Sequence, residues 1–187
     1  MKSNWKNGKL GDYISIKHGY AFKGDFITTA DNAVVLVTPG NFQIGGGFQE
    51  KKCKFFDSDY PKEYVLKSND LIVTMTDLSK NGDTLGYSAK IPNNKHRVYL
   101  HNQRIGLVTI NSECIDKDFL YWFMRTPQYQ KTIVSTASGS TVKHTSPDRI
   151  KDVVIAFPNI KEQIKIASML SAIENKIEIN NTINKNL

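Results

Sequence analysis

The C-terminal segment from Pro158 to Leu187 constrains the fold more than any other part of the sequence. Pro158 ends an apolar run, and Asn159 with Glu162 three positions later resembles a capping box, the arrangement that opens a helix. No Gly or Pro follows before Leu187, so the sequence predicts one helix of about 40 Å at 1.5 Å per residue. A domain of this size rarely needs so long a helix to cover itself, and we expect the helix to project outward.

A seam of regularly spaced residues runs along this predicted helix. Its members recur in alternating steps of four and three, which is the spacing of a coiled coil. They are Ile166, Leu170, Ile173, Ile177, Asn180, Asn184 and Leu187. The two asparagines weaken packing, but they can fix the register when they pair across the seam. The pattern indicates a partner helix, and packing of the helix on its own domain alone is the alternative.

Short apolar runs rich in β-branched residues indicate buried strands in the preceding part of the chain. The runs cover residues 34–37, 71–75, 105–110 and 153–157. Helix starts are indicated at Asp116 or Asp118, at Thr126-Pro127 and at Ser146-Pro147. We therefore expect an α/β (mixed α+β) fold, in which a twisted mixed β-sheet domain over residues 1–158 precedes one long coiled-coil-forming helix over residues 159–187.

The charge balance points to a polyanionic partner. The 187 residues include 25 Lys and Arg against 18 Asp and Glu, a formal charge of +7. Such a surface attracts nucleic acid, which is the first partner to test. Cys53 and Cys114 match no metal or disulfide spacing, and no apolar segment has signal-peptide or membrane-spanning length. We expect a soluble cytoplasmic protein with free thiols.

No catalytic motif is visible in the sequence. The glycine triplet at 45–47 is not followed by the Lys-Ser or Lys-Thr pair of a phosphate-binding loop, and the four histidines lack metal-ligand spacing. Asp148 and Glu174 suggest a nuclease-like pair, but a solvated helix surface explains Glu174 better. We expect no catalytic residue, no metal and no cofactor in this chain.

Polar, glycine-containing loops carry the side chains that could read DNA. Forked or paired donors and acceptors are needed to recognise base edges, and lysines suit phosphates. The candidates are Lys23, Asn41, Gln43, Lys51, Lys52, Ser79, Lys80, Lys95, Arg97, Asn102, Gln103, Arg104, Ser140, Lys143 and His144. Lys51 and Lys52 are better suited to phosphates than to bases. For Asn102 and Gln103 a role in a buried polar network is an equal alternative.

Four groups of residues, taken in order, carry a family resemblance. They are Trp5-Lys6 with Leu10-Gly11-Asp12 and Gly19-Tyr20-Ala21-Phe22-Lys23; residues 66–74; His101-Asn102-Gln103-Arg104-Ile105-Gly106; and the segment from Gly139 through Pro147 to Pro158-Asn159-Ile160-Lys161-Glu162-Gln163. Their order and spacing resemble the specificity subunit of type I restriction-modification systems over essentially the whole chain. The Pro-x-x-x-Glu-Gln pattern at the start of the long helix is the most telling piece.

The resemblance implies a target-recognition domain followed by a conserved spacer helix. It implies double-stranded DNA as ligand and no catalysis in this subunit. It also implies modification subunits that bind S-adenosylmethionine and methylate adenine, together with restriction subunits, ATP-driven motors and nucleases that use ATP and Mg²⁺. A subunit of this kind would read one half of a bipartite target and direct methylation or cleavage by its partners.

The sequence departs from that family in holding one recognition domain where complete members have two. Either the chain is a fragment, or it is a half-length form whose helix pairs antiparallel with a second copy in a homodimer. Two other functions remain open, a nuclease or methyltransferase acting alone and a protein-interaction module without DNA binding. The sequence does not reveal the recognised bases.

Overall fold

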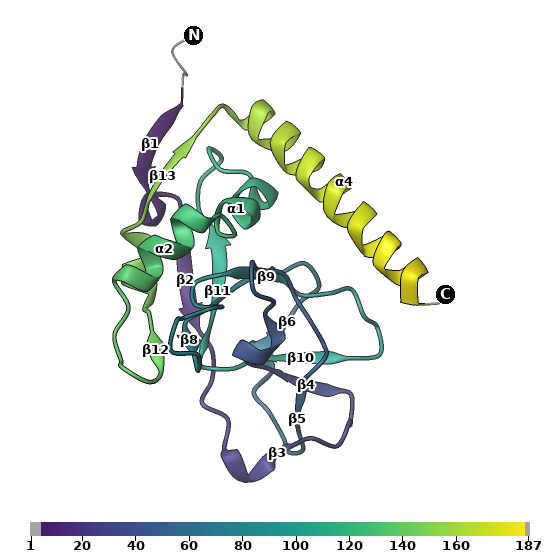
Figure 1. Ribbon diagram of the computed structural model, residues 1–187. Helices are drawn as coiled ribbons and strands as arrows, with labels where there is room; N and C mark the ends of the chain where they lie inside the picture. Colours follow the sequence, from purple (N-terminus) through teal and green to yellow (C-terminus); the bar gives the residue numbers. More distant parts are fainter. Residues whose placement is uncertain (1–4, 186–187) are drawn as a thin grey trace.

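The computed structural model describes residues 5–185 as a body of short strands with one long helix leaving it (Figure 1). The helices are α1 (Lys117–Phe123), α2 (Pro127–Ser135), α3 (Pro147–Lys151) and α4 (Ile160–Lys185). The strands are β1 (Lys6–Lys9), β2 (Ile14–His18), β3 (Ile27–Thr28), β4 (Val34–Val37), β5 (Lys54–Phe56), β6 (Val65–Leu66), β7 (Leu71–Thr74), β8 (Thr76–Asp77), β9 (Ser88–Lys90), β10 (Val98–His101), β11 (Ile105–Ile110), β12 (Lys143–His144) and β13 (Val154–Phe157).

Two sheets form most of the body. One has the strand order β3-β5-β4-β10-β6, and the other has the order β2-β11-β7-β9. Strands β4 and β10 pair in parallel, whereas the other strand pairs in both sheets are antiparallel. Two ribbons, β1-β13 and β12-β8, complete the described strands. The predicted mixed α and β class with a long C-terminal helix is confirmed, and its strands are divided among four sheets.

The predicted strands and helix starts agree closely with the structure. Strands β4 and β11 have the predicted bounds, and β7 and β13 are each one residue shorter. The side chains of Asp116, Thr126 and Ser146 accept hydrogen bonds from the first turns of α1, α2 and α3. Of the two aspartates proposed as the cap of the first helix, Asp116 fills that role. Its carboxylate accepts from two backbone amides, which would otherwise lack partners.

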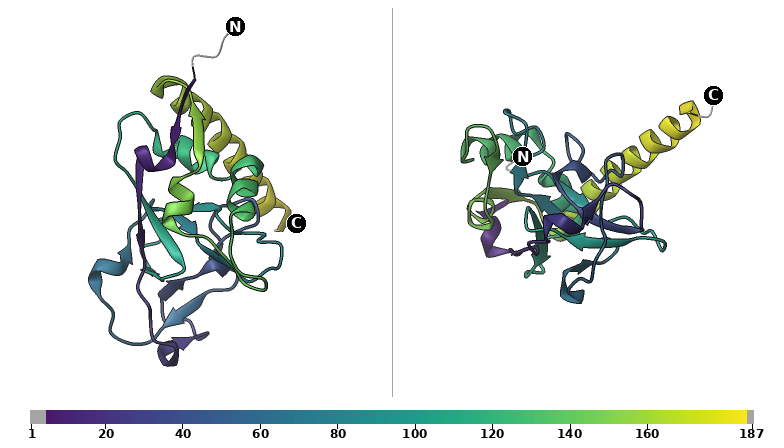
Figure 2. Two further views of the ribbon diagram at one scale, coloured as in Figure 1. Left: turned by 90° about the vertical axis from the view of Figure 1, so that its left-hand side faces the viewer. Right: turned by 90° about the horizontal axis from the view of Figure 1, so that it is seen from below.

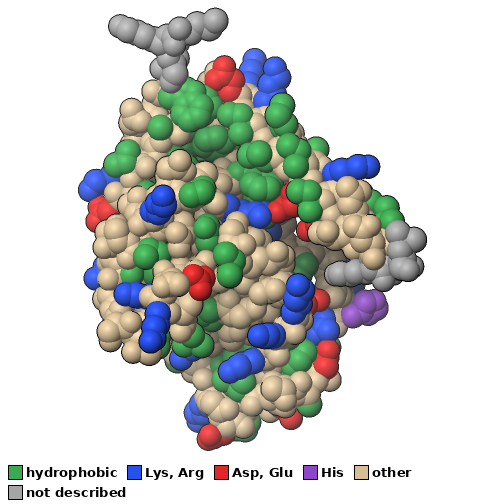
Figure 3. All heavy atoms as spheres, viewed as in Figure 1, with side chains coloured by type: hydrophobic (Ala, Val, Ile, Leu, Met, Phe, Trp, Pro, Cys, Tyr) green, Lys and Arg blue, Asp and Glu red, His purple; other side chains and the backbone are tan. Residues whose placement is uncertain are grey.

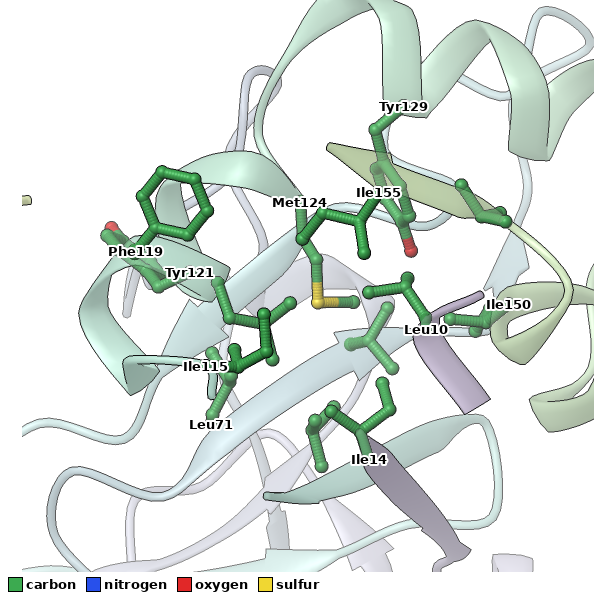
Figure 4. Close-up of a cluster of buried hydrophobic side chains, with 14 of the residues drawn as sticks. Leu10, Ile14, Leu71, Ile115, Phe119, Tyr121, Met124, Tyr129, Ile150 and Ile155 are labelled. Carbon is green, nitrogen blue, oxygen red and sulfur yellow. The ribbon is translucent and has the colours of Figure 1, made fainter. Parts of the chain in front are cut away.

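Three apolar clusters fill the body. The largest lies between the four-stranded sheet and helices α1 to α3, and includes Leu10, Ile14, Met124 and Ile155 (Figure 4). A second cluster lies between the two sheets, and a third covers the other face of the five-stranded sheet around Phe22. Each fully buried Leu or Ile contributes about 1.5–3 kcal/mol. Because these clusters fix the strands, they also fix where the connecting loops emerge.

Gln163 anchors helix α4 to the body. Its side chain is fully buried; it accepts from the amide of Asp116 at 2.9 Å and donates to the carbonyls of Cys114 at 2.8 Å and Pro158 at 2.9 Å. About two turns further along α4, Ser171 Oγ accepts a hydrogen bond from the indole N–H of Trp122 at 3.1 Å. The first half of α4 therefore lies along α1, and the glutamine of the Pro-x-x-x-Glu-Gln motif has a structural role.

The second half of α4 leaves the body, as expected (Figure 2). Of the predicted seam, Ile166 and Leu170 are half-buried against the body, whereas Ile173 and Ile177 are each 54% exposed. Asn180 and Asn184 are exposed as well, and Leu187 lies outside the described residues. Within residues 5–185, no helix has the length and apolar character needed to cross a membrane. The division into domains 1–158 and 159–187 stays a prediction.

Candidate nucleic-acid interface

Four loops emerge at one end of the two sheets. The parallel register that pairs Val37 with His101 brings the carboxyl ends of β4 and β10 together. The pairing of Thr74 with Ile105 places the end of β7 beside the start of β11 at the same level. Segments 38–52, 77–84 and 102–104 therefore leave the sheets on the same side.

The fourth loop, residues 138–144, joins them through the ribbon of β8 and β12 (Figure 1). The amide of Thr145 donates to the Met75 carbonyl at 3.0 Å, and the amide of Met75 donates to the Arg104 carbonyl at 2.9 Å. These bonds place the 102–104 turn, β8 and the fourth loop side by side. We call the surface made by residues 38–52, 77–84, 102–104 and 138–144 the loop face.

The loop face collects most of the residues predicted to contact DNA. Those exposed on it are Gln43, Lys51, Lys52, Lys80, Gln103, Arg104, Ser140 and His144, and Ser79 and Lys143 are half-buried there. Lys and Arg side chains gather over the lower half of the surface seen in Figure 3, beside the hollow between the body and α4. Polar and basic groups from four separate segments thus share one surface.

Two residues predicted to contact DNA lie inside the protein, and for Asn102 this agrees with the buried polar network that was its equal alternative. Asn41 is fully buried; its Oδ1 accepts from the amide of Thr38 at 2.9 Å and its Nδ2 donates to the Gln49 carbonyl at 3.2 Å. Asn102 is buried too, and its Oδ1 accepts from the amide of Arg104 at 3.0 Å. Both amides satisfy loop backbone groups from inside, so they shape the loops and are not offered to a ligand.

Three further candidates do not belong to the four segments of the loop face, although Arg97 reaches its edge at Glu50. Lys95 and Arg97 precede β10, at the opposite end of the strand from the 102–104 turn. The Arg97 guanidinium contacts Asp31 at 2.8 Å and Glu50 at 3.8 Å, so its charge is already partnered by two carboxylates. Lys23 is exposed in a separate hollow beside Phe26 and Tyr60.

Asp77 organises the second loop from inside. Its carboxylate accepts from the Ser79 amide at 2.6 Å, from Thr84 Oγ1 at 2.7 Å and from the Thr84 amide. Burial pushes the pKa of Asp77 upward, but these hydrogen bonds outweigh it and hold the pKa below its usual value. Asp77 is therefore ionised at neutral pH, and its charge is directed into the loop backbone.

Arg125, two residues after the end of α1, holds the first loop and α4 together. Its guanidinium stacks over the rings of Trp122 at 4.4 Å and Tyr121 at 4.8 Å, donates to the Gly45 carbonyl at 2.9 Å and pairs with Glu174 of α4. Gly46 has a φ of +85°, and a Cβ there would lie 2.5 Å from the Arg125 side chain. The glycines thus allow both the left-handed turn and the close approach of Arg125.

Two exposed apolar side chains of the loop face escaped the reasoning from sequence. Ile44 is 75% exposed and Leu78 is 68% exposed. Both line one hollow of about 550 Å³, together with Gln43, Lys51, Lys52 and other residues of the first two loops. In the second loop the available signal was Leu78 as the single large apolar residue, whereas in the first loop nothing in the sequence separates Ile44 from Phe42, which is buried, and Phe48, which is half-buried.

The carboxylates considered for a nuclease are used elsewhere. Asp148 pairs with Lys151 of its own helix at 2.8 Å, and Glu174 pairs with Arg125. In the described part of the chain, no group of three or more His, Cys, Asp or Glu side chains could hold a metal ion. Asp148 and Glu174 have separate structural partners in this fold.

Comparison with known proteins gives consistent relatives. The sequence matches the family model of the type I restriction modification DNA specificity domain over residues 2–187. It is 28% identical over 184 residues to the type I restriction enzyme MjaVIII specificity subunit of Methanocaldococcus jannaschii. This alignment covers 96% of this chain and 41% of that protein. It is 25% identical over 173 residues to the EcoBI specificity subunit of Escherichia coli, covering 92% of this chain and 33% of that protein.

Solved structures show the same fold. The type I restriction-modification S subunit from M. genitalium superposes with a TM-score of 0.64 at 18% identity, over 95% of this chain and 41% of that chain. The HsdS subunit of Thermoanaerobacter tengcongensis gives 0.59 at 11% identity, over 96% of this chain and 39% of that chain. The sequence thus spans between 33% and 41% of the length of these relatives. With the family model matched over residues 2–187, the chain belongs to the type I restriction modification DNA specificity domain family.

Proposed function

We propose that this chain reads one part of a duplex DNA sequence through the loop face, as a target-recognition domain without catalysis of its own. The observation that carries the proposal is the convergence of four polar loops at one end of the sheets, with Lys51, Lys52, Lys80 and Arg104 exposed on them. A protein that reads DNA must neutralise phosphates and reach base edges from the same surface. The loop face offers both kinds of side chain.

The two tasks fall to different residues. Gln43, Gln103 and Arg104 are exposed and carry the forked or paired groups that recognise adenine and guanine. Lys51, Lys52 and Lys80 are single cations on flexible stems, which suit phosphates. Asp77 directs its charge into its own loop, so it opposes DNA binding less than a solvent-facing carboxylate would.

A second copy of the chain would supply the other half of a bipartite target. Each residue turns a helix by about 100°, so Ile173, Ile177 and Asn180 lie roughly 90° around α4 from the body-facing line of Gln163, Ala167 and Glu174. This second stripe is exposed and begins where α4 leaves the body. Antiparallel pairing along it would give a homodimer with two loop faces.

Membership of the family supports a proposal for the wider assembly. Modification subunits would bind S-adenosylmethionine and methylate adenine, and restriction subunits would use ATP and Mg²⁺. This chain would then select where those subunits act. No residue of the chain is assigned to methyl transfer or to strand cleavage.

The proposal is tested by selecting sequences from a random duplex pool with the purified chain at about 50 mM salt, and by titrating the selected duplex with salt. We expect the pool to yield a preferred sequence. The logarithm of the affinity should fall linearly with the logarithm of the salt concentration, with a slope of about −0.9 per phosphate contact. Binding that is insensitive to salt, or a pool that gains no sequence preference, would contradict the proposal.

The two alternative functions have their own outcomes. Incubating the pure chain with duplex DNA, Mg²⁺ and S-adenosylmethionine should give neither cleavage nor methylation, and turnover would favour an enzyme acting alone. The double variant Ile173→Asp, Ile177→Asp, which disrupts the exposed stripe of α4, should keep its non-specific affinity for DNA. Loss of all binding in that variant would favour a protein-interaction module.

A further inference from the structure

The tips of the first two loops are apolar although the other exposed side chains of these loops are polar. Ile44 and Leu78 are 75% and 68% exposed, and both line the hollow of about 550 Å³ on the loop face. Isolated exposed apolar residues are common on protein surfaces. Two at the tips of separate loops, facing one hollow, call for a ligand with an apolar group.

Hydrogen bonds within the loop and to the body hold the turn that carries Ile44. The Gln43 amide donates to the Gly47 carbonyl at 3.0 Å and the Gly46 amide donates to the Gln43 carbonyl at 3.0 Å, which makes a tight turn with Ile44 near its apex. Arg125 then holds that turn through the Gly45 carbonyl at 2.9 Å. The exposed isoleucine therefore stands on a turn that is tied to the body.

The second tip is built in a comparable way. The carboxylate of Asp77 accepts from the Ser79 amide at 2.6 Å, and Leu78 lies between these two residues. The turn that directs Asp77 into the loop thus leaves the side chain of Leu78 in solvent. Both apolar tips are consequences of ordered turns.

The charges around the tips favour a polyanion over an apolar protein surface. Lys51 and Lys52 are exposed on the same hollow, and Lys80 is exposed two residues after Leu78. The carboxylate among the hollow's lining residues, Asp77, is already hydrogen-bonded within its loop. Cations beside an apolar tip match a DNA groove, where phosphates flank the base edges.

Thymine supplies the apolar group that such tips can recognise. Its C5-methyl group projects into the major groove, where apolar side chains make contact with it. We propose that Ile44 and Leu78 are specificity-determining residues that contact thymine methyl groups in the recognised sequence. This inference rests on the proposed function and names part of the sequence that the loop face selects.

The test replaces thymine by uracil, which removes the methyl group and keeps the base-pairing edge. The duplex selected from the random pool is remade with each thymine changed in turn, and its affinity for the full chain is measured. Removing one buried methyl group should weaken binding roughly 3- to 10-fold at one or two positions. Ile44→Ala or Leu78→Ala should weaken binding to the thymine duplex similarly, and should abolish the difference between thymine and uracil at one of those positions.

Val154→Ala provides the matched control. Val154 is 62% exposed but lies on β13, in a ribbon with β1 away from the loop face. This variant should keep both the affinity and the full response to uracil. If it altered the response as the loop variants do, the inference would be wrong, because the effect would not depend on the loop tips.

The remaining outcomes are distinct. A pool without any sequence preference contradicts the proposed function itself. A selected sequence whose thymines all tolerate uracil contradicts only the methyl contact, and loss of affinity in the alanine variants would then indicate an apolar wedge between base steps. Alanine variants that keep wild-type affinity and uracil response would overturn the role of Ile44 and Leu78.

Discussion

The loop face and the distal half of α4 are held to the molecule by different forces. The loops take their shape from polar side chains turned inward, above all Asn41, Asp77 and Arg125. Beyond Glu174, α4 relies on its own backbone hydrogen bonds and exposes Ile177, Ile179 and Ile183. Removing an inward polar group should therefore cost stability, whereas changing the distal helix should act mainly on what that helix binds.

The largest effect is expected from Arg125→Ala. The change leaves the Glu174 carboxylate and the Gly45 carbonyl without this donor and removes the stacking on Trp122. We expect a loss of about 2–3 kcal/mol in the free energy of unfolding by urea denaturation, with faster amide exchange at residues 43–49. Arg104→Ala, at an exposed position of the loop face, should cost less than about 0.5 kcal/mol. Equal costs for the two variants would remove the distinction between inward and outward side chains.

A smaller, pH-dependent effect is expected from Asp77→Asn. Asparagine keeps the size but loses the charge-assisted bonds to Ser79 and Thr84, at a cost of about 1–2 kcal/mol at pH 7.

The sign of the pH dependence follows from the lowered pKa of Asp77. A carboxyl whose pKa is lower in the folded than in the unfolded chain stabilises the fold fully above the unfolded value of about 3.9. That stabilisation disappears as pH falls through the folded pKa. Urea unfolding from pH 7 downward should therefore show wild type and Asp77→Asn converging below about pH 4. A difference that stays constant with pH would mean that the ionised carboxylate does not hold the loop.

The smallest effect on stability is expected from Ile173→Asp combined with Ile177→Asp. Both side chains are more than half exposed, so the free energy of unfolding of the monomer should change by about 0.5 kcal/mol or less. The mass measured by sedimentation should fall from dimer to monomer, because two charges now lie on the proposed seam. Ala167→Asp, on the buried side of the same helix, should instead destabilise the fold strongly. A stable dimer in the double variant would place the partner contact elsewhere.

Local sequence signals predicted the helices well. The caps at Asp116, Thr126 and Ser146 act on amides two or three residues away, so their effect is visible in a short stretch of sequence. Strand β10 and the pairing of β1 with β13 were missed. The first is a short run between polar loops, and the second joins segments at opposite ends of the chain.

The candidate site was predictable in composition but not in arrangement. Polar loops were recognisable from their residues, yet their convergence depends on the parallel register of β4 and β10, which is a long-range feature. The burial of Asn41 could not be seen from sequence, because its amide is hydrogen-bonded to Thr38 and Gln49 only once the loop has folded. For Arg97, the ion-pair partner Asp31 lies 66 residues earlier in the chain, where no local pattern reveals it.

The salt dependence of DNA binding tests most directly whether the loop face is the surface that meets DNA. The double variant Lys51→Ala, Lys52→Ala removes two charges from the loop face. The control variant Lys67→Ala, Lys95→Ala removes two exposed charges that precede β7 and β10, at the ends of these strands that lie away from the loop face. The first pair should lower the slope of log affinity against log salt by about 1.8 at 0.9 per phosphate, and the second pair should leave it unchanged. Equal slopes for the two double variants, or a larger change in the second, would contradict recognition through the loop face.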